Sequence, residues 1–221
     1  MSLFDRLRLG LLTKSMAIAS RNETRVTVAG IRLTVAPGVC HPAPGMGLSF
    51  APLFEAALEG IQAGDTVLDI GTGTGIWGLI ASRAGAAVTA TDLAHVPLDV
   101  VRRTAEDNGI PCPDLRHGSL FEPVTGERFD RVLFNPPFHF GEPTSEAEKA
   151  TLGGADGEVV KSFLGLLPSH LEPGGAGYAI LPRAEQAGYA EALANAVPVA
   201  TLRIPVMGPV SLFRIAAEVD R

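Results

Sequence analysis

A short apolar segment followed by three closely spaced glycines constrains the fold of this chain more than any other part of its sequence. Residues 67–70 (Val-Leu-Asp-Ile) lead directly into Gly71, Gly73 and Gly75. Glycine adopts positive φ angles readily and lets a ligand approach the backbone closely. The first amides of a following helix have no partner within that helix. The pattern therefore predicts a buried strand, a tight loop and a helix that begins near Gly75, with a ligand site at the loop.

Short apolar segments alternate with amphipathic segments along most of the chain. We expect strands at residues 66–70, 87–91, 115–117, 130–134, 177–181, 197–204 and 210–219. We expect helices at residues 49–59, 96–108, 156–171 and 183–195, in addition to the helix near Gly75. Strands that alternate with helices form a parallel sheet with helices on both faces. The last two strands are joined only by residues 205–209 and should pair as an antiparallel hairpin.

The N-terminal region follows a different pattern. Residues 1–20 carry apolar side chains at helical spacing, which predicts a helix. Residues 25–28 and 31–35 alternate polar and apolar side chains around Ala29-Gly30, which predicts a β-hairpin. We therefore divide the chain into an N-terminal helix and hairpin extension over residues 1–45 and a single α/β domain over residues 46–221.

Composition and charge favour a cytoplasmic protein that acts on a small molecule or a protein. No apolar run reaches the roughly 18 residues that a membrane helix needs. The two cysteines, Cys40 and Cys112, do not form a disulfide framework, as is usual in a reducing compartment. The net charge is −6 and the 18 lysines and arginines are dispersed, so the overall basic character typical of nucleic-acid-binding proteins is missing.

The spacing of the glycines and the position of Asp69 distinguish between two kinds of cofactor. A dinucleotide fingerprint reads Gly-x-Gly-x-x-Gly around a pyrophosphate. This loop reads Gly-x-Gly-x-Gly and has an acidic residue, Asp69, two positions before it. A carboxylate there suits a cationic amino group, such as that of the methionine part of S-adenosylmethionine. Asp92 ends the next expected strand, where its carboxylate can bind the ribose hydroxyls of either cofactor.

The segment Asn135-Pro136-Pro137-Phe138 follows the expected strand at residues 130–134, so it should share a sheet edge with the glycine loop. The Asn135 side-chain carbonyl and the Pro136 backbone carbonyl can accept the two hydrogens of a substrate nitrogen and aim its lone pair at a methyl group. The two prolines restrict the backbone, and Phe138 offers a ring face to a planar substrate. We therefore predict catalytic roles for Asn135, Pro136 and Phe138.

Three segments resemble motifs of a known family. Val67 to Gly75 resembles the first motif of class I S-adenosylmethionine-dependent methyltransferases, and residues 135–138 resemble the Asn-Pro-Pro-aromatic motif of those that methylate amide or exocyclic nitrogens. Residues 152–157 (Leu-Gly-Gly-Ala-Asp-Gly) resemble a segment of the HemK-like protein-glutamine methyltransferases. The resemblance implies a Rossmann-like, seven-stranded, mostly parallel sheet with helices on both faces and an antiparallel hairpin at its C-terminal end.

The resemblance also implies roles for single residues. Asp69, Gly71 and Gly73 would contact the methionine part of the cofactor, Asp92 would bind the ribose, and Asn135 would bind the acceptor nitrogen. The other residues expected at the cofactor adjoin these motifs and are Thr72, Gly75, Leu93, Ser119 and Leu120. Ser119 stands where the family often has an acidic residue near the adenine, and its hydroxyl can still accept one hydrogen bond.

The predicted function is S-adenosylmethionine-dependent methylation of an amide or amine nitrogen in a protein glutamine or a small metabolite. An RNA or DNA base is the alternative acceptor. A nicotinamide-dependent oxidoreductase and a non-catalytic nucleotide-binding module are alternatives of other classes, and the glycine spacing argues against the first. The histidines at positions 41, 95, 117 and 170 are not clustered and show no metal-ligand spacing, so no metal site is predicted. The pattern does not predict an oligomeric state.

Overall fold

The computed structural model describes residues 23–37, 39, 50–137, 140–143, 152–191, 193–204 and 208–216. The predicted helix over residues 1–20 and the predicted catalytic residue Phe138 lie outside the described residues. None of the helices in these ranges is long and apolar enough to cross a membrane.

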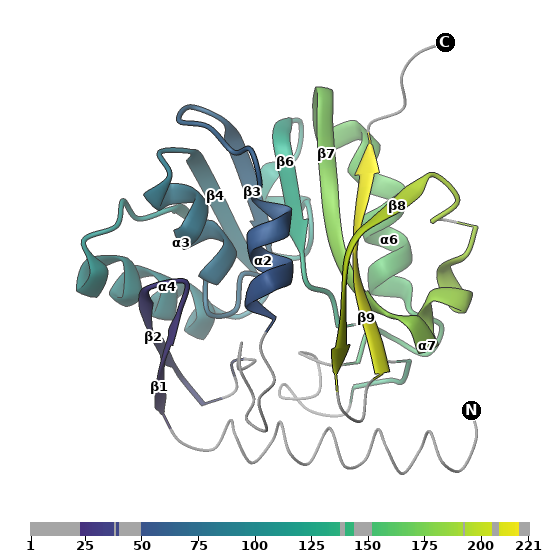
Figure 1. Cartoon of the computed structure of the whole chain (residues 1–221), viewed down its shortest axis with the longest axis horizontal. Helices are drawn as coiled ribbons and strands as arrows, with labels where there is room; N and C mark the ends of the chain where they lie inside the picture. The colour runs from purple at the N-terminus through teal and green to yellow at the C-terminus, as the bar shows by residue number, and fades with distance from the viewer. Residues whose placement is uncertain are drawn as a thin grey trace.

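A seven-stranded sheet forms the centre of the molecule (Figure 1). In spatial order its strands are β5 (Asp114–His117), β4 (Ala87–Asp92), β3 (Thr66–Ile70), β6 (Phe129–Phe134), β7 (Leu171–Pro182), β9 (Gly208–Ala216) and β8 (Ala196–Ile204). The strands from β5 to β7 are parallel to one another, and β9 is antiparallel to both β7 and β8. The predicted α/β sheet with a C-terminal antiparallel hairpin is therefore confirmed.

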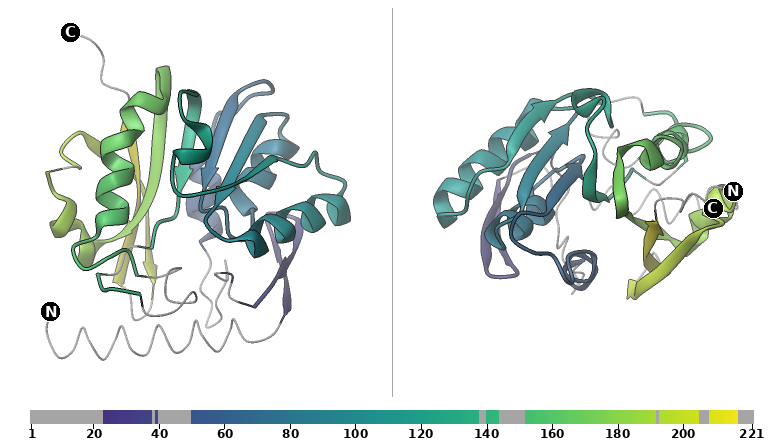
Figure 2. Two further views of the ribbon diagram at one scale, coloured as in Figure 1. Left: turned by 180° about the vertical axis from the view of Figure 1, so that it is seen from behind. Right: turned by 90° about the horizontal axis from the view of Figure 1, so that it is seen from above.

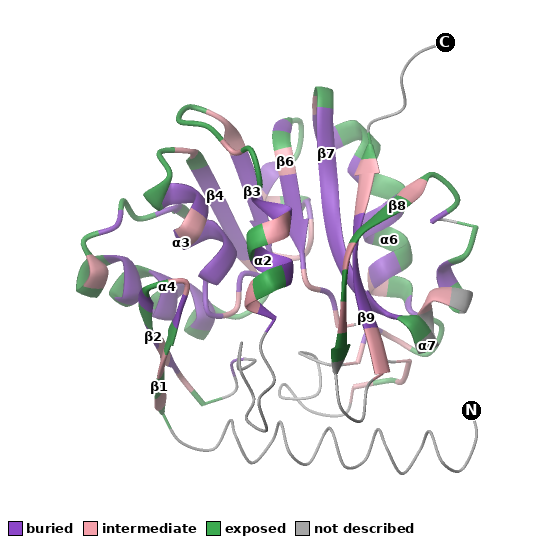
Figure 3. Ribbon diagram, viewed as in Figure 1, coloured by how far each residue is buried: buried purple, intermediate pink, exposed green. Residues whose placement is uncertain are grey.

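Alternate residues of the central strands face two separate layers of helices. Val67 and Leu133 pack in the same core as α2 (Ala51–Ala57), α3 (Ile76–Arg83) and α4 (His95–Asn108). Leu68 and Val132 pack on the other face with α6 (Glu158–Leu166). The helix α2 lies in front of the sheet in Figure 1, and α6 lies in front of it in the reverse view of Figure 2. Because both faces are covered, the central strands are buried along most of their length (Figure 3).

The predicted N-terminal hairpin forms a separate two-stranded sheet of β1 (Thr24–Val28) and β2 (Ile31–Val35). Its side chains Ile31 and Leu33 are buried in the core that contains α3 and α4. The side chain of Asn108 at the end of α4 pairs with the backbone of Arg32: Nδ2 donates to the Arg32 carbonyl at 2.9 Å and Oδ1 accepts from the Arg32 amide at 3.0 Å. The hairpin is thus fixed to α4 and shares its core.

The predicted helix over residues 156–171 is shorter than expected. The α-helix ends at Leu166 and continues as a 3-10 turn, Leu167–His170, because Pro168 has no amide hydrogen for the α-helical bond. Strand β7 then begins at Leu171, before the expected start at residue 177. Phe129 pairs with Leu171 and Arg131 with Ala176, so the residues between them on β7 bulge out of the ladder.

The predicted helix over residues 183–195 is wrong beyond its first turn. Only α7 (Arg183–Gln186) is α-helical, and a 3-10 turn at Ala187–Tyr189 follows it. Tyr189 and Leu193 are buried in the core on the α6 side of the sheet. The backbone at Gly188 lies against the ring of Phe140, since a methyl group at 188 would lie 2.5 Å from that ring. These contacts with distant residues override the local helical pattern.

Candidate active site

The carboxyl ends of the parallel strands lie along the lower edge of the sheet in Figure 1. At this edge Ile70 of β3 lies beside Phe134 of the neighbouring strand β6. Gly71 directly follows β3 and Asn135 directly follows β6, so the glycine loop and the predicted catalytic segment are adjacent. Asp92 ends β4 on the other side of β3. The strand order reverses between β3 and β6, and open α/β sheets bind ligands at such a point.

The three glycines of the loop all have left-handed backbone angles, with φ of +59° at Gly71, +54° at Gly73 and +76° at Gly75. A methyl group added at Gly71 would lie 3.3 Å from the Phe134 ring, whereas one at Gly73 would meet its nearest neighbour only at 3.8 Å. A methyl group at Gly75 would lie 2.5 Å from the Val101 side chain of α4. Gly75 is therefore needed for the packing of α3 against α4, and its predicted contact with a cofactor stays a prediction.

Asp69 is buried at the end of β3, with 2% of its surface exposed. Its Oδ2 accepts hydrogen bonds from the Thr72 hydroxyl at 2.7 Å and from the Gly78 amide at 3.1 Å. Burial raises the pKa of the Asp69 carboxyl to about 7, against the effect of these hydrogen bonds, and the nearby Asp92 carboxylate adds a smaller increase. A cationic group bound beside Asp69 would favour its ionised form.

Both carboxylate oxygens of Asp92 accept backbone hydrogen bonds. Oδ2 accepts from the Gly73 amide at 3.1 Å, and Oδ1 accepts from the Ala94 amide at 2.9 Å. Burial raises the pKa of the Asp92 carboxyl above its ordinary value. The bond to Gly73 fixes the end of β4 to the glycine loop, so two of the predicted binding elements have a defined relative position.

Two histidines meet beside Asp92, although the sequence did not predict it. The rings of His95 and His117 stack with centroids 4.0 Å apart and 10° between their planes. The Nε2 atom of His117 lies 2.9 Å from the carbonyl oxygen of Leu93. The prediction that the histidines are not clustered is wrong for this pair, because the ends of the parallel strands β4 and β5 converge. Among the described residues, no group of three or more His, Cys, Asp and Glu side chains is placed to hold a metal ion.

The loop after β5 carries Ser119 and Leu120, two of the residues predicted at the cofactor. Leu120 has a φ of +44°, an uncommon backbone angle for a residue other than glycine. The amide of Ser119 donates to the Glu122 carboxylate at 3.2 Å. Leu93, which the same prediction places at the cofactor, has 53% of its surface exposed. Residues with a strained backbone angle, as at Leu120, are common in ligand-binding loops.

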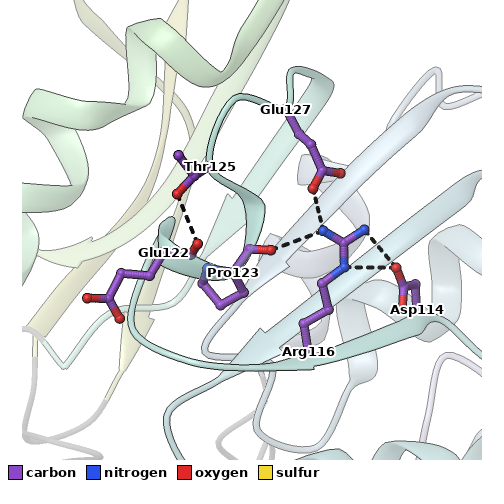
Figure 4. Close-up of polar contacts among 6 residues, drawn as sticks. All are labelled: Asp114, Arg116, Glu122, Pro123, Thr125 and Glu127. Carbon is purple, nitrogen blue, oxygen red and sulfur yellow. Dashed lines mark hydrogen bonds and ion pairs between the residues drawn. The ribbon is translucent and has the colours of Figure 1, made fainter.

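Arg116 in β5 stabilises this loop (Figure 4). Its guanidinium donates to the Asp114 carboxylate at 2.8 Å and to the Pro123 carbonyl at 3.1 Å. It also pairs with the carboxylate of Glu127. Because Pro123 and Glu127 lie beyond Ser119 and Leu120 in the chain, these contacts fix the far end of the loop to the strand that precedes it.

Asn135 carries a buried polar atom that has no hydrogen-bond partner in the described part of the chain. Its Oδ1 is buried and accepts no hydrogen bond from any described residue. Buried side-chain carbonyls are rarely left in this state, because desolvation of an unpaired polar atom costs about 1–3 kcal/mol. Pro136 next to it is buried. An unpaired acceptor beside the glycine loop is the arrangement that a substrate N–H group would complete.

Comparison with known proteins gives the family of this chain. A family model described as the methyltransferase small domain matches residues 52–197. The chain belongs to this family. The matched region of the methyltransferase small domain includes β3, the glycine loop, β6 and Asn135.

Relatives of this methyltransferase small domain include protein and RNA methyltransferases. The release factor glutamine methyltransferase of Xylella fastidiosa (strain Temecula1) is 34% identical over an alignment of 136 residues, and the match covers 56% of this chain and 50% of the relative. The chain thus spans about half the length of the curated relatives that it matches. The predicted resemblance to the HemK-like branch is confirmed by these relatives.

Two solved structures share the fold. The 16S rRNA N2 G1207 methyltransferase of T. thermophilus, in complex with AdoMet and guanosine, has a TM-score of 0.64 and 22% identity, and the match covers 89% of this chain and 50% of that one. The ribosomal protein L11 methylase of Lactobacillus delbrueckii subsp. bulgaricus has a TM-score of 0.61 and 21% identity, with 83% and 84% of the two chains covered. These similarities support the methyltransferase fold.

Gly78 is a site residue that the sequence prediction missed. Its amide donates to Asp69, and a methyl group at this position would lie 3.2 Å from Oδ2 of Asp69. Glycine inside a helix costs about 1 kcal/mol relative to alanine. Its presence in the first turns of α3 was the available signal that another group approaches the helix closely at this point.

Proposed function

We propose that this chain is an S-adenosylmethionine-dependent N-methyltransferase that acts on an amide or amine nitrogen. The observation that carries the proposal is the buried Oδ1 of Asn135, to which none of the described residues donates a hydrogen bond. It follows β6 directly and adjoins a glycine loop flanked by two carboxylates whose pKa values are raised by burial. Membership in the methyltransferase small domain family supports the same function.

The residues at the sheet edge fit this cofactor. Asp69 would hold the amino group of the methionine part, because a cation offsets the burial of its carboxylate. Gly71 and Gly73 would admit the cofactor to the backbone, and Asp92 would accept hydrogen bonds from the ribose hydroxyls. The adenine would lie near Leu93, Ser119 and Leu120, and Thr72 would act by holding Asp69.

Asn135 and Pro136 would prepare the acceptor nitrogen. Bound S-adenosylmethionine supplies an electrophilic methyl group on a sulfonium sulfur. The Asn135 side-chain carbonyl and the Pro136 backbone carbonyl would accept the two hydrogens of the substrate NH2 group. Holding these hydrogens turns the nitrogen lone pair away from its conjugated carbonyl or ring and stabilises the positive charge that develops on nitrogen. The surplus proton then leaves to water, so the proposal needs no general base.

The acceptor that we propose is the side-chain nitrogen of a glutamine in a protein. A small metabolite with an amide or amine nitrogen would fit the same site. The similarity to release factor glutamine methyltransferases and the net charge of −6 support a protein acceptor in the cytoplasm. The fold similarity to an rRNA methyltransferase crystallised with guanosine keeps an RNA base as the second candidate.

Transfer of a radiolabelled methyl group from S-adenosylmethionine tests this proposal. The chain is incubated with the labelled cofactor and, in separate tubes, with a peptide-chain release factor, ribosomal proteins, small primary amides or ribosomal RNA. We expect label in a protein, located on a glutamine by mass spectrometry and suppressed by excess S-adenosylhomocysteine. Label in RNA alone would replace the proposed substrate with the second candidate. Absence of label in every tube would contradict the proposed activity.

A further inference from the structure

The turn formed by residues 152–157 lies against the chain that follows Asn135, at Pro137 and again at Gly141. The Gly141 amide donates to the Gly154 carbonyl at 2.8 Å, and these residues form an antiparallel bridge. The Val159 amide in α6 donates to the Gly153 carbonyl at 3.1 Å. The turn therefore connects the chain that leaves Asn135 to helix α6.

The backbone of Gly153 lies closer to the Pro137 carbonyl than any side chain at position 153 would allow. A methyl group built on its Cα would lie 2.1 Å from the carbonyl oxygen of Pro137 and 3.3 Å from its carbonyl carbon. No side chain can occupy that space, because nonbonded carbon and oxygen atoms do not approach so closely. The φ angle of Gly153 is outside the left-handed region. The contact with Pro137, and not the backbone angle, is thus what requires glycine here.

The turn has little freedom to move away from Pro137. The Val159 amide of α6 holds the Gly153 carbonyl, and α6 is itself held on the sheet by the buried side chains Val160 and Phe163. A side chain at position 153 would therefore displace Pro137, which is only two residues from Asn135.

A second contact holds the chain beyond the prolines. The ring of Phe140 lies against two glycine backbones, since methyl groups at Gly157 and Gly188 would lie 2.6 Å and 2.5 Å from its atoms. Phe140 also packs on Tyr189, with ring centroids 5.5 Å apart. The chain on both sides of residues 138–139 is thus fixed by small residues that approach it closely.

We propose that Gly153 is a positioning residue for methyl transfer: its missing side chain lets the 152–157 turn seat the Pro137 carbonyl, and this fixes Asn135 and Pro136 in the orientation that receives the acceptor nitrogen. The inference rests on the proposed function and assigns a role to a position outside the motifs that contact cofactor and substrate.

Gly153→Ala is expected to lower kcat for methyl transfer by about 10- to 100-fold, the loss that a displacement near 1 Å produces in a preorganised site. The dissociation constant for S-adenosylhomocysteine should stay within about twofold, because the glycine loop and Asp92 are not touched. Gly165→Ala is the matched control: Gly165 lies in α6, and an added methyl group has no neighbour within 4 Å. The control should keep the parent kcat. An unchanged kcat in Gly153→Ala would overturn the proposal.

Hydrogen exchange of the Gly141 amide provides a readout that does not depend on activity. This amide should be protected in the parent protein and in Gly165→Ala and should exchange faster in Gly153→Ala, while amides of β3 keep their protection. Equal protection in Gly153→Ala would overturn the proposal even if the parent protein showed no methyl transfer, so the proposed function and the role of Gly153 are tested separately.

If Gly153→Ala does not fold, Leu152→Ala replaces it. Leu152 packs against Gly141 and should show the same effects at smaller size, and no effect on exchange or kcat would contradict the proposal.

Discussion

Replacing Asn135 with alanine should lower the rate of methyl transfer by about 100- to 1,000-fold, which is the usual effect of removing one preorganised polar group that stabilises a transition state. The substitution deletes the buried Oδ1 that has no described partner. Binding of S-adenosylhomocysteine should be retained. Because the deleted acceptor makes no hydrogen bond with a described residue, the melting temperature should not fall. Single-turnover transfer of labelled methyl and calorimetric titration of S-adenosylhomocysteine measure the two effects separately.

Asn195→Ala is the control for this experiment. Asn195 is exposed in the turn before β8, away from the glycine loop, and its removal should change neither rate nor cofactor affinity. A parent-like rate in Asn135→Ala would contradict the catalytic assignment. A loss of cofactor affinity equal to the loss of rate would show that Asn135 acts on binding instead.

Asp69→Asn should weaken binding of S-adenosylmethionine by about 10- to 100-fold, since a hydrogen bond to a charged group contributes about 1.5–3 kcal/mol. Asparagine has the same shape, and its Oδ1 can still accept from Thr72 and Gly78. The substitution therefore removes only the negative charge, which would bind the amino group of the cofactor. Asp99→Asn, at an exposed position in α4, is the matched control and should leave the affinity unchanged.

The raised pKa of Asp69 makes this binding depend on pH. With a pKa of about 7 in the free protein, the carboxyl is mostly protonated at pH 6 and mostly ionised at pH 8. A cationic cofactor binds the ionised form, so the affinity of the parent should rise across this interval, and Asp69→Asn should lose most of the rise. The free energy of unfolding of the free protein should instead fall as the pH rises. The folded pKa lies above the unfolded value of 3.8, so burial of Asp69 destabilises the fold progressively as pH rises from about 4 to 7. A parent affinity that is flat between pH 6 and 8 would contradict the assignment of Asp69 to the cofactor amino group.

The parts of the site that the sequence predicts are those fixed by local pattern and strand direction. The apolar segments of the sequence predict the strands β3, β4 and β6. Parallel strands have their carboxyl ends at the same edge of a sheet. Asp69, Asp92 and Asn135 therefore had to lie near one another once the strands were assigned. The loop conformation at Gly71 and Gly73 followed from glycine spacing for the same reason, because positive φ angles are a property of single residues.

The parts that the sequence does not predict depend on contacts between distant segments. The stacking of His95 on His117 requires β4 and β5 to be neighbours, and the approach of Gly153 to Pro137 depends on where α6 seats its first turn. The sequence pattern around Gly188 predicts a helix, but the backbone there instead adapts to the ring of Phe140 and to the buried Tyr189. Hydrophobic periodicity carries no information about these pairings.

The thermal stability of the chain with separate cofactors tests the central claim most directly. The melting temperature is measured with S-adenosylmethionine, S-adenosylhomocysteine, NAD and NADP in separate samples. A ligand at a hundred times its dissociation constant adds about 2.7 kcal/mol to the stability of the folded state. Our account predicts a clear increase with the two adenosyl sulfur compounds and none with the nicotinamide cofactors. An increase with NAD or NADP alone, or with none of the four ligands, would contradict it.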